Sequence, residues 1–150
     1  LKSRACFLCI ENNLPKLTAQ TITTLIRGSV PSAEQGQFTV LNVNAKSAEC
    51  VLIYDNSQLR FGGTLSGPTM MTLADAAMYA AVLAHYGEQL LAVTQDFSIH
   101  FLSKPAATDL HATATILKAG KRSVVLTVHL YSQQQLVAHA SGTYALPRSA

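Results

Sequence analysis

Charged side chains are scarce in this chain of 150 residues: Asp, Glu, Lys and Arg make up 13% of it, whereas 49% is hydrophobic. The apolar content supplies the core of one ordinary domain, residues 1–150, and excludes a disordered chain. So low a charge content also indicates that another subunit covers part of the surface. The net charge is only +3, and without a basic block it argues against a nucleic-acid partner.

Metal-ligand clusters and long apolar runs are also missing. Of three cysteines, Cys6 and Cys9 form a C-x-x-C without a second pair of ligands, so we expect reduced thiols in a reducing compartment and no metal site. Residues 5–10 are too short for the core of a secretory signal. The longest apolar run contains Asp75 and His85 and is shorter than the roughly 20 residues that span a bilayer. These features predict a cytoplasmic protein with no membrane segment and no cofactor.

The N-terminal part of the chain reads as a helical extension followed by a hairpin. Within the extension, residues 1–37, apolar side chains recur at helical spacing over residues 14–27 and end at Gly28. This pattern predicts an amphipathic helix that covers an edge or mouth of a sheet. Residues 38–43 and 49–54 are β-rich and predict two strands joined by a polar turn.

One long helix and a series of strands account for the rest of the chain. Pro68 and Gly87 bracket an apolar, Ala-rich helix over residues 69–86, since proline suits a helix start and glycine a helix end. Alternation in the strand after it places Thr94 on the face of Asp96, opposite the apolar residues. The order predicts an α+β fold in which the helix packs on the concave face of a curved antiparallel sheet. The expected strands are 91–101, 110–117, 123–131 and 136–146.

Asp75 is the only charged residue between Arg60 and Glu88, and its neighbours are almost all apolar. A buried carboxylate costs several kcal/mol unless it is paired or hydrogen-bonded, so such a residue serves either a structural pair or chemistry. The glycine-rich turn at residues 62–68, GGTLSGP, opens the same helix. A turn, a helix N-terminus and a lone acid together indicate an active site.

Four segments resemble the 4-hydroxybenzoyl-CoA and phenylacetate-pathway thioesterases of the hotdog fold, and the resemblance covers residues 38–146. It implies a curved antiparallel sheet wrapped around one long helix, and hydrolysis of a medium-chain or aromatic acyl-CoA to free acid and CoA. The segments that carry it are GTLSGPTMMTLAD at 63–75, AVTQDFSIHFL at 92–102 with KPA at 104–106, GKR at 120–122 and LVAHASGT at 136–143.

The helix start departs from the family pattern, His-Gly-Gly followed seven residues later by an acid. Those positions hold Ser66, Gly67, Pro68 and Asp75, so the first glycine and the acid are retained while the histidine and the second glycine are replaced. The family asparagine six residues before the histidine is Arg60 here. These replacements bear on rate and substrate range more than on reaction class.

The resemblance assigns roles to Gly67, Asp75 and Thr94. The Gly67 N–H, at a helix N-terminus, would stabilise the tetrahedral oxyanion of thioester hydrolysis. Asp75 would act as general base or nucleophile, and Thr94 would position the water. Eight residues separate Gly67 from Asp75, roughly 12 Å along a helix, so both cannot reach one carbonyl within a subunit. The spacing therefore predicts a site shared across a homodimer, alone or within a dimer of dimers.

Other residues are expected around an acyl-CoA, whose CoA part is substrate rather than cofactor. Cations suit its phosphates, and methionine and tyrosine suit an apolar acyl group. The expected substrate-binding residues are Arg60, Ser66, Pro68, Met71, Met78, Tyr79, Lys104, Lys121 and Arg122.

Several alternatives stay open at this point. Asp75 would also fit a structural acid, Met71 and Met78 core residues, and Lys121 and Arg122 a solvated turn. Loss of the family histidine and asparagine fits a non-catalytic acyl-CoA-binding protein. A hotdog dehydratase or hydratase ranks below it, because that chemistry needs a histidine near the helix start.

Overall fold

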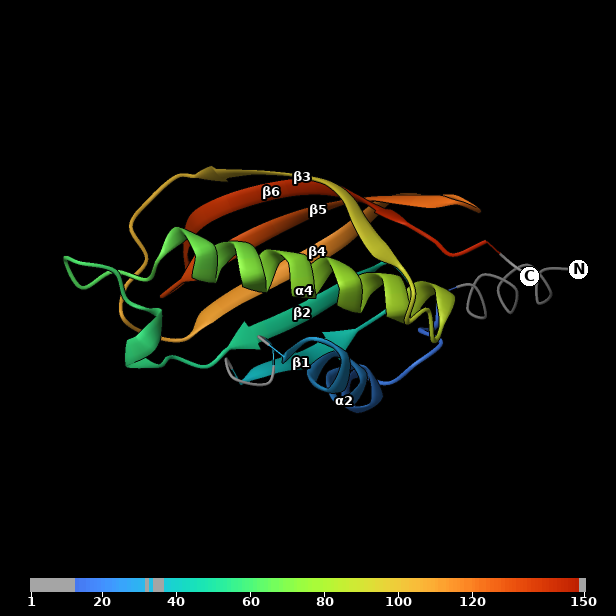
Figure 1. Ribbon diagram of the computed structural model, residues 1–150, viewed down its shortest axis with the longest axis horizontal. Helices are drawn as coiled ribbons and strands as arrows, with labels where there is room; N and C mark the ends of the chain where they lie inside the picture. Colours follow the sequence, from blue (N-terminus) through green and yellow to red (C-terminus); the bar gives the residue numbers. More distant parts are fainter. Residues whose placement is uncertain (1–12, 32, 34–36, 149–150) are drawn as a thin grey trace, which may run out of the picture.

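A six-stranded antiparallel sheet curves around one long helix, α4 (Gly67–Tyr86), which lies along its concave face (Figure 1). The computed structural model describes residues 13–31, 33 and 37–148, so Cys6 and Cys9 lie outside the described residues. The strand order is β1-β2-β4-β5-β6-β3, and every neighbouring pair is antiparallel. This arrangement confirms the expected α+β hotdog architecture.

Every expected strand is present, with ends displaced by two residues or fewer. Strand β5 alternates buried and half-buried positions along its whole length, because one face packs on α4. The predicted inward residues of β4 and β5, such as Ala114 and Leu126, are fully buried. The strands are β1 (Phe38–Val43), β2 (Ser47–Leu52), β3 (Val93–Phe101), β4 (Leu110–Ala119), β5 (Ser123–Ser132) and β6 (Gln135–Ala145), and a short 3-10 helix, η1, spans Asn56–Gln58.

Helix α4 begins two residues before its predicted start, at a defined cap. The Ser66 hydroxyl accepts the Thr69 N–H at 3.2 Å, and Pro68 occupies the first turn. At the other end Gly87 adopts φ +87° and donates its N–H to the Leu83 carbonyl at 2.9 Å, as a glycine C-cap does. Buried alanines on several sides of α4 allow close packing on the sheet. No helix of the described residues is both long and apolar enough to cross a membrane.

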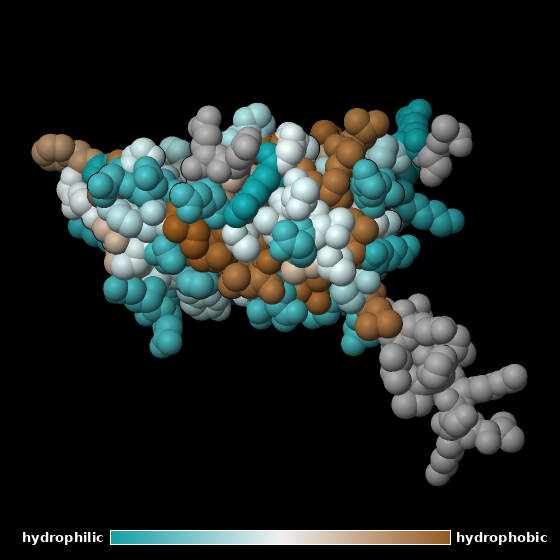
Figure 2. Space-filling view, turned by 90° about the horizontal axis from the view of Figure 1, so that it is seen from below, coloured by the Kyte–Doolittle hydropathy of each residue, from teal (hydrophilic) through white to brown (hydrophobic). Residues whose placement is uncertain are grey.

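The N-terminal helix α2 (Ala19–Ser29) starts five residues later than predicted. Pro15 disfavours helical backbone at the residue before it, and the Thr18 hydroxyl caps the helix by accepting the Thr21 N–H at 3.2 Å. Gly28 lies inside the last turn, so it does not end the helix. Helix α2 covers β1 as expected: Arg27 Nε donates to the Phe38 carbonyl at 2.7 Å. Figure 2 shows the face on this side, where apolar groups lie in separate patches between hydrophilic ones.

A β-bulge in β3 overturns the predicted facing of Thr94. The register of β3 on β6 shifts between Thr94 and Asp96, so Thr94 pairs with Tyr144 and Asp96 with Thr143. The extra residue, Gln95, reverses the alternation. Thr94 therefore lies on the inner face with Tyr144, toward α4, while Asp96 stays on the outer face. The sequence analysis put Thr94 on the wrong face because the alternation of apolar and polar residues cannot reveal an inserted residue.

Candidate active site

The Asp75 carboxylate is held by two hydroxyl donors from the sheet. Thr94 Oγ1 donates to Asp75 Oδ1 at 2.7 Å, and the Tyr144 hydroxyl donates to the same oxygen at 2.9 Å while lying 3.1 Å from the Asp75 carbonyl. Asp75 is half-buried rather than fully buried as expected, because it faces the edge of the sheet, where β3 leaves room. Within the described residues Oδ2 has no hydrogen-bond partner, so one carboxylate oxygen is fixed and the other is available to a substrate or water.

Tyr144 is a site residue that sequence reasoning missed. It lies buried on β6, sixty-nine residues from Asp75 in the chain. Burial raises the pKa of Tyr144, and the negative charge of Asp75 raises it further, so the phenol stays protonated and remains a donor. One sequence signal could have found Tyr144: it continues the inward-facing alternate positions of the last strand, after Ala138, Ala140 and Gly142.

A cavity of about 340 Å³ opens beside Asp75. Tyr79, one helical turn beyond Asp75, lies 6% exposed in its wall and stacks on Tyr144, with ring centroids 5.9 Å apart and an interplanar angle of 9°. Apolar residues of the α2 end and of β3, among them Val30 and Val93, line much of the rest. Met71 borders a second hollow of about 330 Å³ that also contains Asp75 and Thr94. The carboxylate thus lies at the junction of two spaces.

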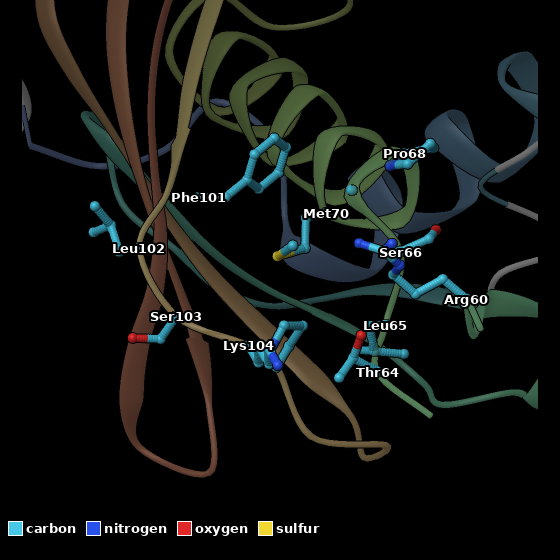
Figure 3. Close-up of a pocket in the computed structure, with 12 residues that line it drawn as sticks. Arg60, Thr64, Leu65, Ser66, Pro68, Met70, Phe101, Leu102, Ser103 and Lys104 are labelled. Atoms are coloured by element: carbon cyan, nitrogen blue, oxygen red, sulfur yellow. The ribbon is translucent and has the colours of Figure 1, made fainter. Parts of the chain in front are cut away.

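Apart from these two spaces beside Asp75, a larger cavity of about 620 Å³ lies at the N-terminus of α4 (Figure 3). Its lining brings together five predicted residues, Arg60, Ser66, Gly67, Pro68 and Lys104. Figure 3 shows that Arg60 and Lys104 reach it from two different loops, so two positive charges flank the helix start.

The Gly67 N–H is the unengaged donor of this helix start. Pro68 has no N–H, the Thr69 N–H bonds the Ser66 hydroxyl, and the Met70 N–H bonds the Ser66 carbonyl. Gly67 has no acceptor among the described residues, and a Cβ placed on it would lie 3.4 Å from Phe101 Cζ. The absence of a side chain therefore keeps open the space between Gly67 and the Phe101 ring.

The remaining predicted residues lie away from both cavities. Met78 is fully buried in the core, and a Cβ added at Gly142 would come within 3.1 Å of its Cε, so the structure does not bring Met78 into the site. Lys121 and Arg122 occupy an exposed turn beside the C-terminus of α4, where the Tyr86 hydroxyl donates to the Gly120 carbonyl at 2.8 Å. That end of the helix is roughly 28 Å from Gly67, so these cations do not share a cavity with Lys104.

The described part of the chain contains no group of three or more His, Cys, Asp or Glu side chains arranged to hold a metal ion. Cys50 is buried and free, and burial raises the pKa of its thiol, which keeps it protonated and unreactive.

The comparison with protein families decides the enzyme class. The family model of the Thioesterase superfamily matches residues 62–139, just over half of the chain. The chain belongs to this superfamily. It is therefore a thioester hydrolase, and the matched stretch of this thioesterase contains Gly67, Asp75 and Thr94, whereas Arg60 and Tyr144 lie outside it.

Solved structures agree with this membership. A proposed thioesterase from Silicibacter sp. TM1040 shares 32% identity over 89% of this chain and 94% of that chain, with a TM-score of 0.78. Two more distant structures show the same fold. The PaaI protein of the Escherichia coli phenylacetic acid degradation operon has 22% identity, coverage of 88% and 95%, and a TM-score of 0.77. A Haemophilus influenzae thioesterase has 16% identity, coverage of 91% and 95%, and a TM-score of 0.79. A comparison with curated protein sequences found no match.

Proposed function

We propose that this thioesterase hydrolyses a medium-chain or aromatic acyl-CoA to the free acid and CoA. Asp75 of one protomer would act as base or nucleophile, and the Gly67 N–H of its partner would stabilise the oxyanion. The observation that carries the proposal is the state of the Asp75 carboxylate: two hydroxyls fix Oδ1, and Oδ2 is left without a partner among the described residues, next to a cavity.

Asp75 has the geometry of a positioned base. In the water route, the water oxygen bonds to the thioester carbon while Oδ2 takes the proton. The tetrahedral intermediate then collapses, the carbon–sulfur bond breaks, and the departing thiolate takes that proton. Thr94 uses its hydrogen on Asp75, so its lone pairs remain to accept a hydrogen bond from the water. In the nucleophilic route, Oδ2 bonds to the thioester carbon and the carbon–sulfur bond breaks, so CoA leaves as a thiolate and an acyl–Asp75 anhydride remains. Water then hydrolyses this anhydride to the free acid and the Asp75 carboxylate, and the proton released goes to the thiolate.

The N-terminus of α4 supplies the positive charge that would stabilise the oxyanion. Its unengaged Gly67 N–H and the positive end of the helix dipole favour an oxyanion there. Arg60 and Lys104 flank the same cavity and would pair with the phosphates of CoA. Ser66 serves here as the helix cap, so it fixes the position of the N–H rather than replacing the family histidine as a catalytic group.

The separation of the two half-sites supports a shared site. Gly67 and Asp75 line different cavities of one protomer, roughly 12 Å apart along α4. Strand β3 is an edge of the described sheet, and apolar side chains on it and beside it are exposed: Val93 by 60%, Phe101 by 49% and Met71 by 42%. A second copy packed antiparallel along this edge would cover them and bring each Gly67 toward the partner's carboxylate.

The acyl group would occupy the space beside Asp75. The cavity of about 340 Å³ is within the range of small-molecule sites. Its walls combine aliphatic side chains and the Tyr79 and Tyr144 rings with the polar groups of Ser29, Thr72 and Thr94. Those walls suit a medium aliphatic chain or one aromatic ring. Lys121 and Arg122 lie on the protomer that supplies Asp75, and their positive charges would add to those of Arg60 and Lys104 on its partner.

The test is free-thiol release from short, medium and aromatic acyl-CoAs by the purified protein and by Asp75→Asn. We expect turnover by the wild type and a loss of at least about 100-fold in the variant. Asp96→Asn is the matched control, because Asp96 is an exposed acid on the outer face of β3, and it should retain wild-type turnover. If acyl-CoAs bind but no thiol is released by the wild type, the protein is a binder and the proposal is wrong.

A further inference from the structure

Phe61 is the most exposed large apolar side chain of the described residues: its exposed fraction is 102%, so no described residue covers its ring. A phenyl ring surrounded by water forgoes the stabilisation that burial would give. The loop between η1 and α4, which contains Phe61, projects beyond the N-terminal end of the helix (Figure 1). Single exposed apolar side chains are common on protein surfaces, so the surroundings of the loop decide whether Phe61 has a function.

Backbone hydrogen bonds hold this loop in one conformation. The Gly63 N–H donates to the Arg60 carbonyl at 3.2 Å, so Phe61 is the second residue of a tight turn. Gly62, the third residue, has φ +100°, a value that favours glycine. At the base of the loop Ser66, the cap of α4, donates its N–H to the carbonyl of the last residue of η1 at 2.9 Å. The turn is therefore tied to the start of the helix, and it presents the ring to a neighbour rather than to the core of its own chain.

An apolar patch lies between the end of α4 and the start of β3. Leu90, Leu91 and Val93 are all exposed there, and Leu90 and Val93 also border the cavity beside Asp75. Exposed apolar side chains that gather in this way mark an interaction surface. Within one protomer, this rim of the cavity has no cover among the described residues.

The shared site would bring the loop and the patch together. In it the α4 helices of two protomers run antiparallel, with Gly67 of one protomer near Asp75 of the other. Residues that precede Gly67 then extend toward residues that follow Asp75 on the partner. The loop with Phe61 precedes Gly67 and continues in the direction of the helix (Figure 1), so it would reach the C-terminal half of the partner's α4. That half holds Tyr79, and the patch of residues 90–93 follows it in the chain and borders the same cavity.

We propose that Phe61 of one protomer packs on Leu90 and Val93 of its partner and closes the cavity beside the partner's Asp75. Phe61 is then a specificity-determining residue: its ring contacts the far end of the acyl group and limits the length of that group. The substrate class is an acyl-CoA whose chain is long enough to reach the ring, of medium rather than short length. This rests on the proposed function and on its shared site, and both exposed apolar surfaces become buried in the dimer.

Photo-crosslinking tests the contact without depending on turnover. The photoreactive residue p-benzoylphenylalanine is placed at position 61 of the full chain, and the protein is irradiated. We expect a covalent dimer on a denaturing gel, with mass spectrometry locating the attachment within residues 88–94. The same photoreactive residue in place of Leu41 is the control, because Leu41 is an exposed apolar residue of β1, the edge of the sheet opposite to β3. No covalent dimer from position 61, or attachment outside residues 88–94, would overturn the inference.

Binding of two CoA thioethers tests the contact with the acyl group. S-octyl-CoA and S-ethyl-CoA cannot be hydrolysed, because they lack the thioester carbonyl, and only the octyl chain is long enough to reach Phe61. In calorimetric titrations, Phe61→Ala should weaken the binding of S-octyl-CoA about 10-fold and that of S-ethyl-CoA by less than about 2-fold. Phe61→Leu, which keeps an apolar side chain, should recover most of the octyl affinity, and Leu41→Ala should match the wild type. Thermal melting checks that the variants fold.

The thioether result separates this inference from the proposed hydrolysis. Equal weakening of both thioethers in Phe61→Ala, no weakening of either, or no preference of the wild type for the octyl compound would each overturn the role of Phe61. Thiol release from octanoyl-CoA by the wild type is measured separately. No release from octanoyl-CoA or from any other acyl-CoA would sink the proposed hydrolysis, while the crosslink and the thioether affinities still decide the role of Phe61.

Discussion

Thr94 donates a hydrogen bond of 2.7 Å to Asp75, nineteen residues earlier in the chain, because a bulge at Gln95 turns it onto the inner face of the sheet. Bulges re-aim single side chains next to active sites, and this one completes the environment of the carboxylate. With Tyr144 on the same oxygen, the carboxylate is oriented before any substrate binds.

Removing the Thr94 donor should slow turnover without unfolding the protein. Thr94→Val keeps the shape and the β propensity, but it leaves Oδ1 with Tyr144 as its one donor and deprives the water of an acceptor. We therefore expect kcat to fall about 10- to 100-fold with a smaller change in KM. Thr94→Ser restores the hydroxyl and should recover most of kcat. Equal kcat values for the valine variant and the wild type, from thiol release, would remove Thr94 from the account.

Replacing Tyr144 by phenylalanine should lower stability as well as activity. The ring and its stacking on Tyr79 are kept, while Asp75 loses one of two donors, so we expect a loss of about 1–2 kcal/mol in the free energy of unfolding. Urea denaturation measures it, with Tyr131→Phe, whose ring lies outside both cavities, as the control. A Tyr144→Phe protein as stable as the wild type would mean that the bond to Asp75 contributes nothing to folding.

The same residue makes stability fall at alkaline pH. Its pKa is raised in the folded protein, whereas an unfolded tyrosine ionises near 10. The stabilisation that protonated Tyr144 contributes is therefore fully present below about pH 10. It is lost as the pH rises from there toward the pKa of Tyr144 in the folded protein. The free energy of unfolding should decline more steeply above pH 10 in the wild type than in Tyr144→Phe. Parallel pH profiles for the two proteins would contradict this assignment.

A methyl group at Gly67 should impair the reaction more than the fold. Gly67→Ala puts a Cβ 3.4 Å from the Phe101 ring, an ordinary packing distance, so the free energy of unfolding should change by less than about 1 kcal/mol. The methyl group lies where the thioester carbonyl would approach the N–H, and we expect at least about a 10-fold loss in kcat/KM. Gly28→Ala is the matched control, since a Cβ there meets nothing within 4 Å.

Local sequence signals were sufficient for the elements but not for the contacts of the site. Ser66, Pro68 and Gly87 act within one helical turn, so the ends of α4 could be predicted closely. The inward turn of Thr94 depends on how β3 pairs with β6, and the Tyr144 contact spans sixty-nine residues, so neither is encoded in a local pattern. Helical spacing likewise could not separate Met78 from Tyr79: adjacent on α4, one fills the core and the other faces the cavity.

The central claim is that one active site combines Gly67 of one protomer with Asp75 of the other, and complementation between inactive variants tests it most directly. Asp75→Asn and Gly67→Val, the latter crowding the Phe101 ring, are produced with different affinity tags. Doubly tagged heterodimers are then isolated and assayed for thiol release.

A shared site predicts that each heterodimer regains one intact site and about half of the wild-type dimer activity, because the Asp75→Asn chain supplies a normal Gly67 and the Gly67→Val chain a normal Asp75. Heterodimers as inactive as the two parent variants would show that each site lies within a single protomer, and would contradict the account.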